Sequence, residues 1–157
     1  MPYAVVAVLF VALACSAPAY AGDDFPELNL NGSVPDGFAL RLQDGPDFYI
    51  WRCELSSAPH DSIPGFGIYF GLNPIPFQPE AGATHHAGSV GGEPVRWRQW
   101  REGKNLRREA MFDYRHSPKH LTLKLHVFIT ARSEAELDAL VQALAQLKFT
   151  TRSPNAA

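Results

Sequence analysis

Cysteine is scarce in this chain of 157 residues, which contains two, Cys15 and Cys53. The first 21 residues carry no charged side chain, and they combine an apolar run with a final Ala-Tyr-Ala, the small-residue pattern that signal peptidase cleaves. We therefore predict a signal peptide over residues 1–21 and a mature chain in which Cys53 is the single cysteine. One cysteine excludes an internal disulfide, so the hydrophobic core has to stabilise the exported domain.

The sequence also lacks the motifs of common catalytic and cofactor sites. G-x-S-x-G, H-E-x-x-H and S-x-x-K are absent, and no Lys-Ser/Thr pair or helix follows the glycines of GSVGGEP (residues 88–94). Neither a hydrolase nucleophile nor a phosphate-binding loop is indicated, and we predict no cofactor. The net charge of −2 at pH 7 favours neither nucleic acid nor an anionic membrane as a partner.

Two alternatives to cleavage of the signal peptide stay open. The uncharged segment approaches the roughly 17–25 residues that span a bilayer, so residues 3–21 could anchor the chain in a membrane. Cys15 could be lipidated, although Ala12 stands where a lipobox has a larger aliphatic residue. We expect cleavage, and with it a periplasmic or secreted protein that has no stable membrane span.

A period of two, typical of β-strands, runs through most of the mature chain. Six segments show it: residues 38–43, 48–55, 66–72, 95–101, 106–114 and 121–130. Turn residues between the first two segments, and again at residues 102–105, predict two hairpins. Residues 73–80 contain three prolines and are predicted to be a surface loop, while residues 22–37 are predicted to be an extended lead-in.

One amphipathic helix is predicted after the last strand. Ser133 and Glu136 form an S-x-x-E capping box, and an apolar stripe at helical spacing follows. We predict a single α+β domain over residues 38–150, in which the helix packs on one face of an antiparallel sheet of about six strands. Residues 151–157 are predicted to be a disordered tail.

The order of these patterns resembles that of small exported PsbP-like α/β domains. The resemblance covers nearly all of residues 38–149, through GFGIYFGLNP, GGEPVRWRQW, LRREAMF and LTLKLHVFITA running into SEAELDALVQALAQLKF. The chain departs from the pattern because no helix is predicted between its early strands. That family includes photosystem accessory proteins and bacterial periplasmic binding or immunity proteins, so the resemblance implies the fold and little about activity. An immunity-type inhibitor is one concrete form that it suggests.

The second hairpin combines arginine with tryptophan, the composition of protein–protein hot spots. Matching its apolar faces points Val95, Trp97, Ala110 and Phe112 inward. The outer face then carries Arg96, Arg98, Trp100, Arg107 and Glu109. Our first hypothesis is a non-enzymatic domain that binds the acidic surface of a protein partner through this exposed face. The alternative is a self-contained face, in which Glu109 pairs with Arg98 and Arg107 stacks on Trp100.

Two further hypotheses concern histidine and glycine. A metal-assisted hydrolase would use His85, His86 and Glu93, which the surrounding glycines place in a predicted loop, but the ligand set is incomplete for zinc and we favour no metal. A lipid or small-ligand carrier would use the glycine face of the strand at residues 65–71 as a groove. Outside these sites, we predict that Cys53 is buried and that His116, His120 and His126 point into solvent.

Overall fold

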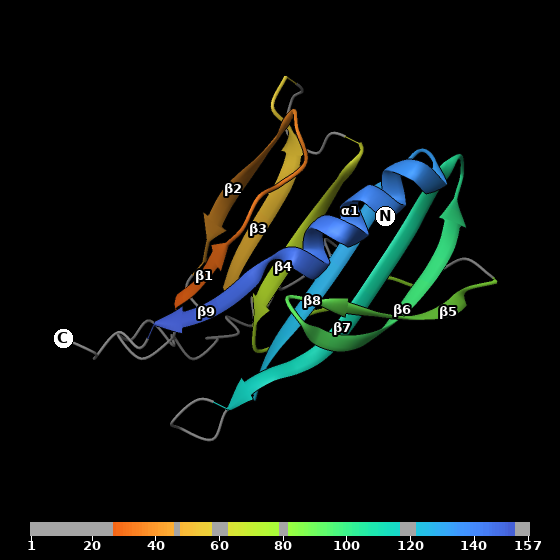
Figure 1. Ribbon diagram of the computed structural model, residues 1–157. Coiled ribbons are helices and arrows are strands. Elements are labelled where there is room, and N and C mark those ends of the chain that lie inside the picture. Colours follow the sequence, from red (N-terminus) through yellow and green to blue (C-terminus); the bar gives the residue numbers. More distant parts are fainter. Residues whose placement is uncertain (1–26, 46–47, 58–62, 79–81, 117–121, 153–157) are drawn as a thin grey trace, which may run out of the picture.

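The computed structural model describes residues 27–45, 48–57, 63–78, 82–116 and 122–152. The predicted signal peptide and His120 lie outside these ranges. The described residues form nine strands and one helix (Figure 1): β1 Glu27–Asn31, β2 Phe38–Asp44, β3 Phe48–Leu55, β4 Gly65–Gly71, β5 Thr84–Val90, β6 Glu93–Glu102, β7 Asn105–His116, β8 Thr122–Ala131, α1 Glu134–Gln146 and β9 Lys148–Arg152. No helix among them is long and apolar enough to cross a membrane.

The strands form two antiparallel sheets. One has seven strands in the order β2-β3-β4-β8-β7-β6-β5, and the other pairs β1 with β9. The prediction of an antiparallel sheet followed by a single C-terminal helix is therefore confirmed over the described residues. The predicted number of about six strands is too low, because β1, β5 and β9 were not expected.

Strand alternation divides the side chains of the large sheet between two faces. The apolar face carries Phe66, Ile68, Leu125, Val127 and Ile129, which belong to one buried cluster together with Leu137, Leu140 and Leu144 of α1. The alternate side chains form the opposite face, which we call the polar face. It carries Arg52, Glu54, Arg98, Trp100, Arg107, Glu109, His126, Phe128 and Thr130.

The two-stranded sheet corrects the predictions for both ends of the domain. β1 lies within the predicted lead-in (residues 22–37), and Thr151 and Arg152 of the predicted tail (residues 151–157) belong to β9. Leu28 of β1 is 1% exposed, and its carbonyl accepts a hydrogen bond of 3.2 Å from the indole Nε1 of Trp51 in β3. The chain before residue 38 therefore contributes to the core.

The start of α1 follows the predicted capping pattern. The hydroxyl of Ser133 accepts a hydrogen bond of 3.2 Å from the backbone N–H of Glu136. The Glu136 carboxylate in turn accepts from the backbone N–H of Arg132, at 2.8 Å, one residue earlier than a capping box requires. Leu147 follows the helix and is 1% exposed, so the predicted apolar stripe continues into the C-terminal cap.

Candidate functional site

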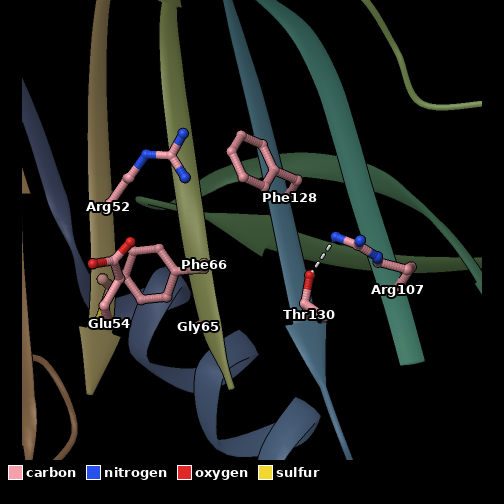
Figure 2. A pocket seen from close by; sticks show the side chains of 8 residues that line it. Arg52, Glu54, Gly65, Phe66, Arg107, Phe128 and Thr130 are labelled. Atoms are coloured by element: carbon pink, nitrogen blue, oxygen red, sulfur yellow. Dashed lines mark hydrogen bonds between the residues drawn. The ribbon is translucent and has the colours of Figure 1, made fainter. Parts of the chain in front are cut away.

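A small pocket lies on the polar face beside the glycines of β4 (Figure 2). Gly65 lines it, together with Arg52 and Glu54 on one side and Arg107 and Thr130 on the other. Its volume is about 100 Å³. Ligand pockets usually measure about 300–1,000 Å³, so this pocket is too small for a lipid.

Aromatic rings of the protein fill the space beside the other two glycines of β4, Gly67 and Gly71. A Cβ atom built on Gly67 would lie 2.1 Å from Cζ of Phe128, and one on Gly71 would lie 2.6 Å from the hydroxyl oxygen of Tyr69. Glycine is used here because an aromatic ring lies against the strand backbone. The groove that a carrier hypothesis requires is therefore filled at Gly67 and Gly71.

The proline-rich loop after β4 crosses the polar face. Residues 73–78 have no regular secondary structure, as predicted. The Phe77 ring of this loop lies 5.4 Å from the ring of His126 and 5.4 Å from that of Phe128, measured between centroids. Its centroid is 5.8 Å from the guanidinium carbon of Arg107. The loop thus covers side chains that the strand pattern alone assigns to solvent.

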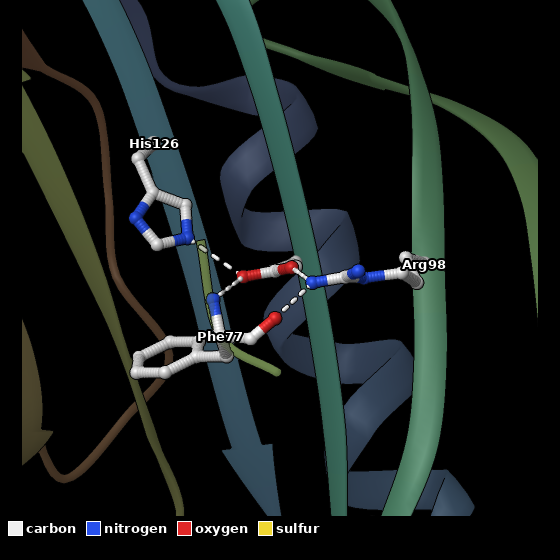
Figure 3. A network of polar contacts seen from close by, with 4 residues as sticks. Phe77, Arg98 and His126 are labelled. Carbon is white, nitrogen blue, oxygen red and sulfur yellow. Dashed lines mark hydrogen bonds and ion pairs between the residues drawn. The ribbon is translucent and has the colours of Figure 1, made fainter. Parts of the chain in front are cut away.

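Glu109 holds this loop through the main chain of Phe77 (Figure 3). The backbone N–H of Phe77 donates to Oε2 of Glu109 at 3.0 Å, and Nε2 of His126 lies 2.8 Å from the same oxygen. Nη2 of Arg98 donates both to Oε1 of Glu109 and to the carbonyl oxygen of Phe77. The peptide groups on both sides of Phe77 are therefore fixed by charged side chains of the sheet.

The Glu109 carboxylate is buried, yet it is held in its ionised form. Glu109 is 4% exposed, as is His126. Burial by itself raises the pKa of the Glu109 carboxyl, but hydrogen bonds from His126, from the Phe77 backbone N–H and from Arg98 together lower it below its ordinary value. Because the carboxylate only accepts hydrogen bonds, His126 donates from Nε2.

Acid is expected to weaken the fold through Glu109. Its folded-state pKa is below the unfolded-state value, so its contribution to the free energy of unfolding is complete above the unfolded value and is lost as pH falls through the folded pKa. Urea unfolding at a series of pH values measures this, with Glu109→Gln as the control for the other carboxyl groups. The difference between wild type and Glu109→Gln should shrink in acid, and a constant difference would contradict the assignment.

The predicted register of the second hairpin is confirmed, while the predicted exposure of its outer face is wrong. Arg98 lies opposite Glu109 and forms the expected ion pair. Trp100 is 5% exposed and Glu109 4%, because loop residues 73–78 cover them. Arg96 is exposed, as predicted.

Arg107 does not make the contact that the self-contained alternative predicts. It does not stack on Trp100, whose ring centroid lies 5.4 Å from the guanidinium carbon of Arg98 instead. Arg107 donates to Glu102 at 2.8 Å and to the Thr130 hydroxyl at 2.6 Å. Arg98 therefore holds the loop, and Arg107 forms part of the pocket wall.

Phe77 and His126 are among the site residues that the sequence patterns missed. His126 was expected in solvent, but it is 4% exposed because the Phe77 ring covers it. A bulky apolar residue between the prolines of a loop was the available signal, since such a side chain gains free energy by covering a surface.

The predicted loop at His85 and His86 is wrong, because both residues lie in strand β5. Adjacent strand residues point to opposite faces, and in the register His85 is opposite Arg98 while His86 is opposite Trp97. Glu93 pairs with Val90 at the far end of the same hairpin. The three residues do not converge, and no group of three metal-ligating side chains occurs among the described residues.

Comparison with protein-family models, curated proteins and solved structures finds no match to this chain. The resemblance to PsbP-like domains thus stays a prediction from the order of the sequence patterns.

Cys53 is buried, as predicted, and its surroundings disfavour the reactive thiolate. It is fully buried in β3. Burial, with a smaller effect from the charge of Glu54, raises the pKa of its thiol to about 12. The nucleophilic thiolate is therefore almost absent near pH 7, and Cys53 belongs to the core.

Proposed function

We propose that this chain is an exported, non-enzymatic domain that binds a protein partner, and that residues 73–78 form its contact loop. One observation carries the proposal: Ile75 is 84% exposed, while Phe77 two residues later is fixed at its N–H and at its carbonyl. An ordered loop that presents an aliphatic side chain loses little conformational entropy on binding. A rigid scaffold with a protruding apolar residue is typical of a recognition loop.

The surroundings of Phe77, two residues after Ile75, support a mixed apolar and charged contact. Phe77 is 38% exposed and Met111 is 37% exposed, and both adjoin His126, through a ring contact and through the strand register respectively. Arg96 is exposed on the neighbouring strand β6. These features fit a partner whose apolar patch has an acidic rim, because charge complementarity at a rim guides association.

The same geometry argues against acid–base catalysis at Glu109 and His126. Both oxygens of the carboxylate accept hydrogen bonds from protein donors, and both residues are 4% exposed. A general base has to reach a proton of the substrate, and these groups are turned toward the loop instead. We assign them to positioning Phe77.

The packing of the helix on the sheet and the location of the domain in the cell are part of the same proposal. Helix α1 covers the apolar face of the seven-stranded sheet, which leaves the polar face and its loop for the partner. A cleaved signal peptide delivers the domain to the periplasm or the medium. An immunity-type inhibitor, which blocks its target by capping a surface, is one form of such a protein.

Changing Ile75 to serine should weaken partner binding without weakening the fold. Ile75 buries little surface in the free domain, so the free energy of unfolding should change by less than about 0.5 kcal/mol. The Kd for a partner captured by the wild-type chain and then purified should rise by about ten-fold or more. Calorimetric titration of the purified pair measures it.

Leu42→Ser is the matched control, because Leu42 is an aliphatic side chain of β2 that is 44% exposed and far from the loop in sequence. It should leave the Kd unchanged. If Ile75→Ser bound the partner as tightly as wild type, or if both variants lost binding equally, the loop would not be the contact surface.

A further inference from the structure

Strand β5 has an edge that pairs with no other strand among the described residues. It is the outermost strand and pairs with β6. Residues 84–88 are exposed, and Gly88, which has no side chain, is among them, so the backbone itself is accessible there. In an antiparallel pair, alternate residues direct their N–H and C=O groups to the partner strand and away from it. A row of backbone donors and acceptors therefore faces outward from β5.

The composition of β5 leaves this edge without the usual protection. Its seven residues, THHAGSV, include no lysine, arginine, carboxylate or proline. Such residues normally prevent an edge strand from pairing with another chain. The opposite edge strand, β2, carries Arg41, which is exposed. The seven-stranded sheet is thus protected by charge at one edge and open at the other.

Positive charge lies immediately behind the open edge. On β6, Arg96 is opposite Ala87 and is exposed, whereas Arg98, opposite His85, is already paired with Glu109. Strands are spaced about 4.8 Å apart, so a strand added outside β5 would lie roughly 10 Å from β6, within reach of an extended arginine side chain. Carboxylates on the added strand would meet Arg96 across His85 and Ala87.

We propose that β5 binds an extended, acidic segment of another protein by strand addition. Backbone hydrogen bonds to residues 84–88 supply the pairing, and Arg96 selects for carboxylates at alternate positions. A second copy of this chain is a poorer occupant, because pairing β5 with itself brings two sets of His85, His86 and Arg96 together. Arg96 belongs to both proposed surfaces, but the pairing uses the backbone of residues 84–88 and not Ile75, so the inference does not depend on the proposed contact loop.

Proline substitution at two adjacent positions tests the geometry. Because backbone direction alternates, one of His86→Pro and Ala87→Pro removes an N–H that pairs with β6, while the other removes an N–H that faces outward. The variant that lacks only the outward-facing N–H should keep wild-type stability, so thermal unfolding identifies it. Ala87→Thr retains the N–H and is the matched control.

The probe is a seven-residue peptide of alternating valine and glutamate, with a valine–lysine peptide as its counterpart. We expect the glutamate peptide to shift the amide resonances of residues 84–88 and to bind about ten-fold tighter than the lysine peptide at low salt. The stable proline variant should lose this binding, whereas Ala87→Thr and Ile75→Ser should keep it.

Three results of the peptide titrations would overturn the inference. They are equal binding of the two peptides, no binding of the glutamate peptide, and wild-type binding by the stable proline variant. A homodimer in light scattering that the stable proline variant abolishes would assign the edge to a second copy, which also overturns it. None of these outcomes bears on Ile75, so a failure here is distinct from a failure of the proposed contact loop.

Discussion

Glu109→Ala is expected to lower the free energy of unfolding by about 3–5 kcal/mol, because it removes one partner from a buried, hydrogen-bonded charge cluster. Arg98, His126 and the Phe77 backbone N–H all lose their shared acceptor. Domains are stabilised by about 5–15 kcal/mol in total, so this single change removes a large share. Urea unfolding followed by tryptophan fluorescence measures the loss.

Asp113→Ala is the matched control on the same strand. The Asp113 side chain is 63% exposed and pairs with Lys124 at 2.6 Å, so its removal should cost less than about 1 kcal/mol. Equal small losses for the two variants would show that the Glu109 cluster does not stabilise the fold. Glu109→Gln should lie between them, because its amide oxygen still accepts a hydrogen bond.

Gly67→Ala is expected to lower the free energy of unfolding by about 1–3 kcal/mol through overpacking. Its Cβ would lie 2.1 Å from Cζ of Phe128, so the ring has to move. Phe128 contacts Phe77 edge-on, with the centroids 5.4 Å apart, and its displacement should also loosen the contact loop. Equilibrium unfolding measures the first effect, and proteolysis of the loop measures the second.

The coupling between Gly67 and Phe128 distinguishes overpacking from the other effects that replacing the glycine has on the free energy of unfolding. In a Gly67→Ala, Phe128→Leu double variant the smaller side chain makes room, so the combined loss should be smaller than the sum of the single losses. Strictly additive losses would show that the Phe128 ring is not what the new methyl group meets.

The parts of the fold that the sequence predicted depend on local patterns. Alternation of apolar side chains together with a turn at residues 102–105 sufficed to place Arg98 opposite Glu109. The same reasoning located β2, β3, β4, β6, β7 and β8, and Ser133 with Glu136 marked the start of the helix. Each of these signals lies within a few residues of the element that it predicts.

The parts that escaped prediction depend on contacts between distant segments. β1 pairs with β9, and Asn31 contacts Thr150 across 119 positions of the sequence, so neither short strand is recognisable alone. The prolines predicted that residues 73–78 lie outside the sheet, but they did not indicate which face of the sheet the loop covers. His126 and Glu109 were assigned correctly to the outer face, yet their burial comes from Phe77, which a strand pattern does not contain.

Hydrogen exchange at the Phe77 amide tests most directly whether Glu109 pins the loop to the polar face. In the wild-type protein this amide should exchange far more slowly than that of Ile75, because its N–H donates to a buried carboxylate. In Glu109→Ala the protection should disappear. A Phe77 amide that exchanges as fast as that of Ile75 in the wild-type protein would contradict the account.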